Sequence, residues 1–145
     1  MSIDISSLNL SILPHVNISF LDKDGNLPQR SGLNWGQRPE YNREPNQAYI
    51  RIPQNISQTS FFPIRGRNFN LFTDDEQYFS CVIAQDNSKA IHTPDNNSQF
   101  GIYFRNRIGV QIDFPVSTKD LIHYGRTDID IYKIDALNYY MDFSV

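Results

Sequence analysis

The hydrophobic pattern of this chain is interrupted by the stretch Ser31-Gly32-Leu33-Asn34-Trp35-Gly36-Gln37-Arg38-Pro39. The stretch holds the only tryptophan, beside two glycines, a proline, an arginine and two amide side chains. Across residues 23–47 no hydrophobic periodicity supports a helix or a strand. A loop of that length inside a compact domain is uncommon and is often functional. Two interpretations follow: a surface loop held by a buried Trp35, or a loop whose Arg, Asn and Gln side chains read base edges.

Length and composition are those of one globular domain. The chain has 145 residues, of which 20% are charged and 13% aromatic, so it can bury a sizeable core and is not a disordered segment. It contains no apolar run of about 18 residues and no basic-then-apolar leader, so we expect no membrane span and no signal peptide. Cys81 is the only cysteine, which excludes an internal disulfide, and its apolar neighbours indicate a core position.

Positive charge is concentrated in the first half of the chain, although the net charge is −3. Residues 23–67 include seven basic and three acidic residues, a net charge of +4, whereas residues 113–142 include three basic and six acidic ones, a net charge of −3. Arginine outnumbers lysine nine to four, which favours forked hydrogen bonding to bases and phosphates. The distribution therefore indicates a basic region around the long loop.

Short strands dominate the rest of the chain. Period-two alternation bounded by turn residues predicts strands over residues 15–21, 48–53, 68–73, 78–84, 128–134 and 138–143. A second polar stretch without a pattern covers residues 85–96. Because strands and helices do not alternate, we expect a mainly β fold, a barrel or sandwich of six or seven strands. Residues 1–14 are expected to be a lead-in or linker remnant, and residues 15–145 the domain.

Two or three short helices are predicted between these strands. Asn55 is expected to cap one that runs through residue 60, and Asn97 to cap another that Gly109 ends. Ser117 and Asp120 have the spacing of a capping box for a third helix, which Gly125 ends.

Catalytic motifs are mostly missing. The three histidines are scattered, and a single cysteine excludes a Cys-based zinc site. The acidic run Asp74-Asp75-Glu76 is more typical of a solvated turn than of a cation site. One alternative nevertheless uses its two aspartates with His92 as the metal ligands of a small nuclease. Another is a β-barrel that binds single-stranded nucleic acid by stacking bases on Trp35, Tyr41 and Tyr49.

Side chains suited to double-stranded DNA are gathered in the two polar loops. In the major groove Arg pairs with guanine and Asn or Gln with adenine, whereas other arginines clamp phosphates and position the protein. The predicted base contacts are Arg30, Asn34, Gln37, Arg38 and Arg43 in the first loop and Gln85, Asp86, Asn87, Lys89 and His92 in the second. The predicted phosphate contacts are Arg65, Arg67, Arg105 and Arg107. A solvated surface position explains each residue taken alone, but the clustering favours a joint role. No catalytic residue, metal or cofactor is expected.

Several blocks of the sequence resemble the C-terminal domain of NgoFVII-type restriction endonucleases. The blocks are residues 31–38, 43–50, 61–63, 73–75, 81–87, 103–107, 124–128 and 140–145, within a similarity that covers roughly residues 15–145. That family couples a phospholipase-D-like nuclease domain to a DNA-recognition domain related to the plant B-three transcription-factor fold. The BfiI and EcoRII restriction enzymes carry similar modules.

The resemblance implies a seven-stranded open pseudobarrel that grips the major groove with the loops after its first and fourth strands. It implies the target-recognition domain of a bacterial, cytoplasmic restriction endonuclease, with the nuclease site and its His-x-Lys motif outside this chain. Trp35 is then expected to brace the first loop rather than to touch a base. The chain is expected to be an excised domain or a stand-alone module, and no oligomeric state is predicted.

Overall fold

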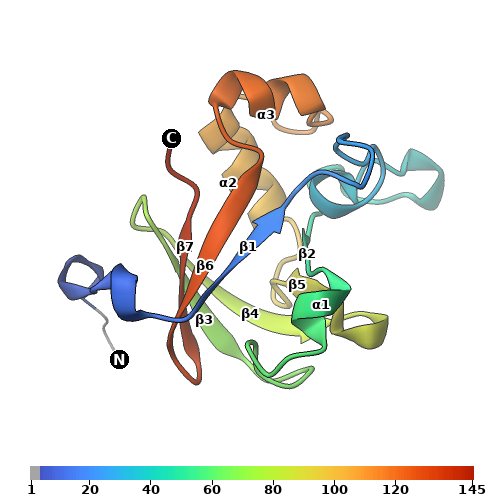
Figure 1. Cartoon of the computed structure of the whole chain (residues 1–145). Coiled ribbons are helices and arrows are strands. Elements are labelled where there is room, and N and C mark those ends of the chain that lie inside the picture. The colour runs from blue at the N-terminus through green and yellow to red at the C-terminus, as the bar shows by residue number, and fades with distance from the viewer. Residues whose placement is uncertain (1–3) are drawn as a thin grey trace.

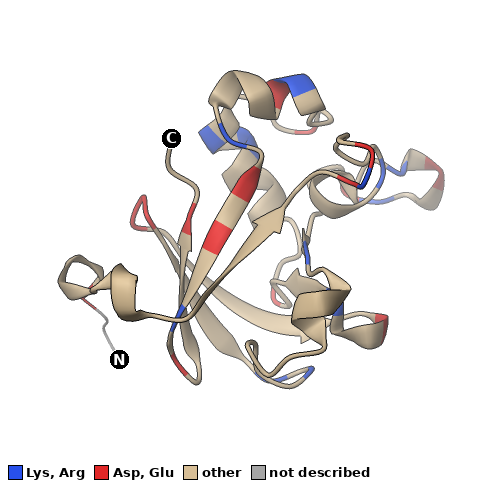
Figure 2. Ribbon diagram, in the orientation of Figure 1, with Lys and Arg blue, Asp and Glu red and all other residues tan. Residues whose placement is uncertain are grey.

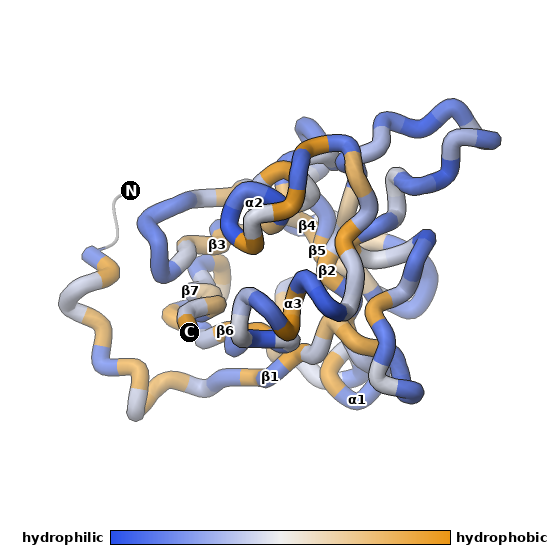
Figure 3. The backbone as a smooth tube through the Cα atoms, turned by 90° about the horizontal axis from the view of Figure 1, so that it is seen from above, coloured by the Kyte–Doolittle hydropathy of each residue, from blue (hydrophilic) through white to orange (hydrophobic). Residues whose placement is uncertain are grey.

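Seven strands form one curled, open sheet in the computed structural model, which describes residues 4–145 (Figure 1). The strands are β1 (His15–Ser19), β2 (Ile50–Arg51), β3 (Phe69–Thr73), β4 (Tyr78–Ala84), β5 (Ala90–His92), β6 (Asp128–Asp135) and β7 (Asn138–Asp142). They lie in the order β1-β6-β7-β3-β4-β5-β2, and all neighbours are antiparallel except the parallel pair β3 and β7. Viewed from above, the strands follow one another around a curve in this order (Figure 3). The predicted mainly β, seven-stranded open pseudobarrel is confirmed.

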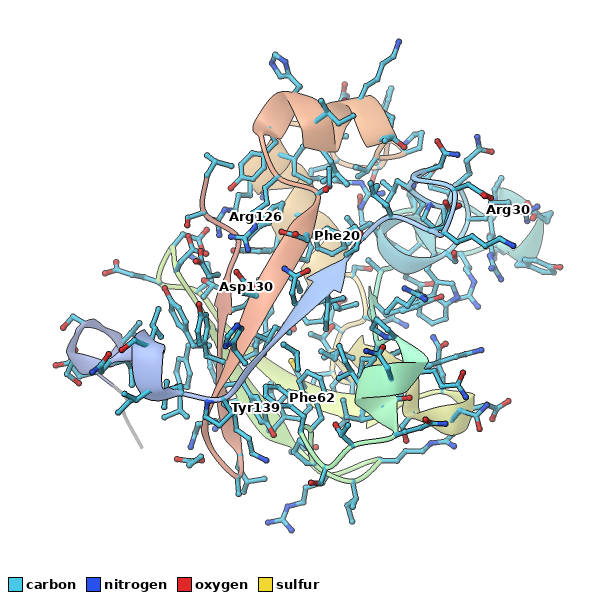
Figure 4. The ribbon with its side chains drawn as sticks, in the orientation of Figure 1. Phe20, Arg30, Phe62, Arg126, Asp130 and Tyr139 are labelled. Atoms are coloured by element: carbon cyan, nitrogen blue, oxygen red, sulfur yellow. The ribbon has the colours of Figure 1, made fainter. Side chains whose placement is uncertain are left out.

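The inner face of the sheet is built by period-two alternation. Phe69, Leu71 and Thr73 of β3 are buried, and their neighbours along the strand are partly exposed. Cys81 of β4 is fully buried, and burial raises the pKa of its thiol, as expected of a core residue. At the lower end of the barrel Tyr139 packs against Phe62 with ring centroids 5.3 Å apart (Figure 4).

Three helices accompany the sheet: α1 (Gln54–Ser57), α2 (Gln99–Ile108) and α3 (Thr118–Tyr124). The capping box of α3 is present, because the Ser117 side chain accepts from the Asp120 backbone N–H and the Asp120 carboxylate accepts from that of Ser117. Gly109 and Gly125 end α2 and α3 in the left-handed conformation, as predicted. None of the helices in residues 4–145 is long and apolar enough to cross a membrane.

Some element boundaries differ from the predictions. Helix α1 begins directly after Pro53, whose fixed φ suits a helix start, so Asn55 lies inside the helix and does not cap it. Helix α2 begins after Ser98, one residue later than predicted. The largest difference is β5, since its three residues lie within a stretch that shows no local pattern and pair with β4 and β2.

The segment before β1 contains two single turns of 3-10 helix, Ile5–Ser7 and Leu10–Ile12, which hold no buried residue. It projects from the side of the barrel opposite to the long loop that follows β1 (Figure 1). The first three residues of the expected lead-in lie outside the described part of the chain.

Candidate nucleic-acid interface

Two loops leave the sheet on one side and flank its β2 edge (Figure 1). We call residues 22–49, between β1 and β2, the first arm, and residues 85–89, between β4 and β5, the second arm. The two arms lead into β2 and β5, which pair antiparallel, with Ile50 opposite Ile91 and Arg51 opposite Ala90. The first arm therefore enters β2 beside the end of β5, and the second arm enters β5 beside the end of β2.

Three rings form an aromatic cluster between the arms. Tyr49 and His92 stack with centroids 5.4 Å apart and planes 7° from parallel, and Trp35 meets them edge-on at 5.5 and 5.2 Å. The Arg43 guanidinium lies 4.1 Å from the centroid of the Trp35 ring. The single-strand alternative needs Trp35, Tyr41 and Tyr49 as stacking platforms for bases. The rings of Trp35 and Tyr49 instead pack against other side chains of the domain, whereas Tyr41 is exposed.

His92 links the cluster to the second arm. Its Nε2 atom lies 3.0 Å from Nε2 of Gln85, the residue that follows β4. Burial lowers the pKa of the His92 imidazole below its ordinary value, which favours the neutral ring. Gln85 has a φ of 68°, in the left-handed region that non-glycine residues rarely adopt.

Amide side chains anchor the first arm to the segment between α2 and α3. Asn34, which is 1% exposed, donates from Nδ2 to the carbonyls of Pro28 at 2.9 Å and Val116 at 2.8 Å. Gln37 donates from Nε2 to the carbonyls of Pro45 at 3.0 Å and Asp113 at 3.1 Å. The predicted base contact of Asn34 is therefore corrected, because its side chain is buried and hydrogen-bonded within the protein.

Two glycines allow the close approach of backbones here. A Cβ atom on Gly36 would overlap the backbone at Glu44 and Gln47, where the two sides of the first arm meet. A Cβ atom on Gly101 in α2 would overlap the Asn46 carbonyl. The first arm therefore packs directly against α2, which limits its freedom to move.

Arg105 lies beneath the first arm rather than on the surface. Its side chain is fully buried, and it donates from Nε to the Phe114 carbonyl at 2.8 Å and from Nη1 to those of Leu33 at 3.3 Å and Gly101 at 3.1 Å. Burial lowers the pKa of the Arg105 guanidinium, and the nearby carboxylates of Glu44 and Asp113 oppose that shift. The predicted phosphate contact of Arg105 is corrected, because this cation is a structural link between α2 and the first arm.

Arg107 is likewise a structural cation. It forms two hydrogen bonds with the Asp74 carboxylate, at 2.8 and 2.5 Å, and donates from Nη1 to the Tyr103 hydroxyl at 2.7 Å. Only 12% of its side chain is exposed, so the predicted phosphate contact of Arg107 is also corrected.

Asp74, the first residue of the acidic run after β3, is the partner of Arg107 in this ion pair. Burial alone would raise the pKa of Asp74, but hydrogen bonds from Arg107 and from the Phe143 backbone N–H hold it below its ordinary value. Asp75 accepts from the hydroxyls of Thr73 and Tyr103. Within residues 4–145 no three His, Cys, Asp or Glu side chains are grouped as a metal site.

Other predicted contacts remain on the surface of the arms. Arg30 is exposed and forms an ion pair with Glu40, and it projects outward in Figure 4. Arg38 is half-buried and donates from Nε to the Arg30 carbonyl at 2.8 Å. The exposed predicted contacts of the second arm are Asp86, Asn87 and Lys89, and those of the turn before β3 are Arg65 and Arg67.

A concave pocket of about 390 Å³ lies between β2, α1 and the second arm. Polar side chains that can reach a base edge line it, among them Arg51, Gln85, Asn87 and Lys89. Arg51 was not predicted as a site residue. The alternation around it places Ile50 and Ile52 inward and Arg51 outward, but the pairing with β5 that brings Arg51 beside the second arm has no local sequence signal.

An acidic region lies on β6 and β7, at the far end of the strand order from β2 (Figure 2). Arg126 contacts Asp128 at 2.9 Å, Asp130 at 2.7 Å and Asp142 at 3.5 Å, and Figure 4 shows Arg126 beside Asp130. One cation among three carboxylates leaves this region negative. It is a surface that a polyanion avoids, in contrast to the arms.

Comparison with known proteins gives one family. A search of curated proteins finds no match. A family model described as the NgoFVII C-terminal B3-like DNA-binding domain matches residues 8–135, which include β1, both arms and the whole of β6. The curled seven-stranded sheet fits that description. The chain therefore belongs to the family of NgoFVII C-terminal B3-like DNA-binding domains.

Proposed function

We propose that this domain recognises a specific sequence in double-stranded DNA, as the target-recognition part of a type II restriction endonuclease, and that it has no catalytic activity. In this proposal the two arms enter the major groove. The observation that carries it is the pocket between β2, α1 and the second arm, where Arg51, Gln85, Asn87 and Lys89 are side chains of the kinds that read base edges.

The structure narrows the set of proposed contacts. The base-reading candidates are Arg30, Arg38, Arg51, Gln85, Asp86, Asn87 and Lys89, and the phosphate contacts are Arg65 and Arg67. Trp35, Gln37, Arg43 and His92 contact other parts of the domain and are proposed to hold the arms in place. Because arginine and lysine favour guanine, the proposed site contains G·C pairs.

Anchored arms support sequence reading. Side chains contribute most to discrimination when the elements that carry them are already held in the binding geometry. The first arm meets this condition because Asn34 and Gln37 bond to the segment between α2 and α3, and Arg105 of α2 donates to the Leu33 carbonyl of the arm.

The position of the N-terminal segment is compatible with a larger enzyme. Residues 4–14 leave the barrel on the side away from the arms (Figure 1). A nuclease domain of the phospholipase-D-like type joined there would not block the DNA-binding side. We propose residues 15–145 as the DNA-binding unit of such a protein, working in the bacterial cytoplasm.

The test is selection of bound duplexes from a pool with a randomised centre, followed by gel-shift titration of the selected duplex. We expect one enriched sequence, and we expect Arg38→Ala to weaken its binding and relax base preference. Lys133→Ala, on β6, is the matched control, because its ammonium contacts the Ser60 carbonyl outside the arms. Equal binding of all duplexes, or efficient displacement by single-stranded competitor, would contradict the proposal.

A further inference from the structure

We propose that His92 is a positioning residue that determines which end of the Gln85 amide faces a base, so that base preference at one position of the DNA site depends on the protonation of His92. This inference rests on the proposed function, since it describes how one residue of the second arm reads DNA. It concerns a residue that contacts Gln85 and need not touch the DNA.

The geometry of the pair links the two side chains. Gln85 lines the pocket between β2, α1 and the second arm, and its Nε2 lies 3.0 Å from Nε2 of His92. An amide nitrogen can only donate, so this contact requires His92 to accept at Nε2 and to carry its proton on Nδ1. Oε1 of Gln85 is then the end left for a ligand, and it can accept from the amino group of adenine or cytosine.

The aromatic cluster fixes the imidazole. The ring of His92 stacks on Tyr49 with planes 7° from parallel. It also contacts the Trp35 ring edge-on, with centroids 5.2 Å apart. These two contacts restrict rotation of the ring, in an orientation that directs Nε2 at Gln85. Gln85 is also restricted, since its φ of 68° places it in a sparsely populated backbone region.

Protonation reverses the hydrogen bond. A charged imidazole carries a proton on Nε2 and can only donate there, so Gln85 has to turn its Oε1 toward His92. The amide NH₂ then faces the base and favours an acceptor, such as O6 or N7 of guanine or O4 of thymine. A proton on His92 therefore changes the preferred base from adenine or cytosine to guanine or thymine.

The side chains shown against His92 are aromatic, amide and apolar. From the first arm, Tyr49 contacts the ring and Arg43 lies on Trp35; the charged residues of the second arm are Asp86 and Lys89. Opposite His92 in the sheet is the apolar Val82. Burial keeps the imidazole pKa below its ordinary value, so the change is expected on the acid side of neutrality.

The experiment is selection from a randomised duplex pool with wild-type domain at about pH 8 and about pH 5. We expect the preference at one position to move from adenine or cytosine to guanine or thymine by on the order of tenfold. His92→Gln should remove this change, and His123→Gln, exposed on α3, should retain it. A general gain in affinity at low pH without a change of preferred base would overturn the inference, because added positive charge alone would produce it.

A measurement without DNA keeps the inference testable if His92→Gln does not fold. NMR of the imidazole nitrogens in the wild-type domain should show the Nδ1–H form at about pH 8. Gln85→Glu should raise the pKa of His92, since a carboxylate accepts from the charged ring, and Gln85→Leu should not. An Nε2–H form in the wild type would overturn the inference.

The two proposals fail in different ways. If no sequence is enriched at either pH, the proposed function is wrong. If one sequence is enriched and is the same at both pH values while His92 titrates by NMR, sequence recognition stands and the role of His92 is wrong.

Discussion

The side chain of Asn34 pairs with the backbone of Val116 as one strand pairs with another. Its Nδ2 donates to the Val116 carbonyl at 2.8 Å, and its Oδ1 accepts from the Val116 N–H at 2.8 Å. Both groups are buried, and the pair joins residues 82 positions apart. The Asn34 amide thus anchors the first arm to the segment that contains Val116, although its residue type and position suggested a base contact.

Asn34→Ala is expected to lower the free energy of unfolding by about 2–3 kcal/mol, because it leaves the Val116 N–H and carbonyl buried without partners. It should also weaken binding to all duplexes by the same factor, because the arm loses its anchor and no base contact is removed. Urea denaturation and gel shifts measure the two effects. Asn55→Ala, exposed on α1, is the control and should change neither. A relaxed base preference with unchanged stability would instead restore Asn34 as a base reader.

Arg51→Ala and Lys89→Ala are each expected to relax base preference in the selected duplex. The loss should be about 1–3 kcal/mol in discrimination for each bidentate contact removed. Both residues line the pocket between β2, α1 and the second arm, and neither is buried. Competition between the selected duplex and single-base variants measures the change, with Lys133→Ala as the control. If Arg51→Ala lowers affinity for all variants equally, Arg51 contacts phosphate.

Arg67 and Arg105 should respond differently to salt. Arg67 is exposed, so Arg67→Ala should reduce the slope of log affinity against log salt by about 1 and weaken all duplexes similarly. Arg105 is fully buried. Arg105→Met should leave the slope unchanged and lower the free energy of unfolding by about 3 kcal/mol, since three backbone carbonyls lose their donor. A reduced slope in Arg105→Met would show that the first arm opens in the complex.

Asp74→Asn is expected to lower the free energy of unfolding by about 3 kcal/mol at neutral pH, because Arg107 loses its carboxylate partner. The site is largely shielded from water, since 12% of the Arg107 side chain and 14% of the Asp74 side chain are exposed. The Asp74 pKa is lower in the folded state, so its contribution is present above the unfolded pKa and is lost as the pH falls through the folded pKa. The difference between wild type and Asp74→Asn should therefore shrink below about pH 4. Denaturation at several pH values checks this, with Asp95→Asn, exposed before α2, as the control. A difference that stays constant into acid would show that Asp74 acts through shape rather than charge.

Local patterns were sufficient for most elements of the fold. The alternation that predicts a strand over residues 78–84 matches β4, Tyr78–Ala84. Buried side chains alternate with more exposed ones along this strand, as the period of two in the sequence requires. The capping box at Ser117 and Asp120 lies within one helical turn, so its residues meet whenever the helix forms. The two polar loops and the resemblance to the NgoFVII family were likewise visible in the amino-acid sequence.

The roles of individual polar residues required long-range contacts. Asn34 and Asn87 are the same residue type in the two arms, yet one is buried against Val116 and the other is exposed. Arg105 and Arg67 differ in the same way. The strand β5 and the place of Arg51 in the site arise from pairing with partners distant in sequence. Periodicity describes which way a side chain points from its own backbone. Burial and hydrogen-bond partners instead depend on which distant segment packs against that side chain. Here the distant segments are brought together by the curled sheet and by the packing of α2 against the first arm.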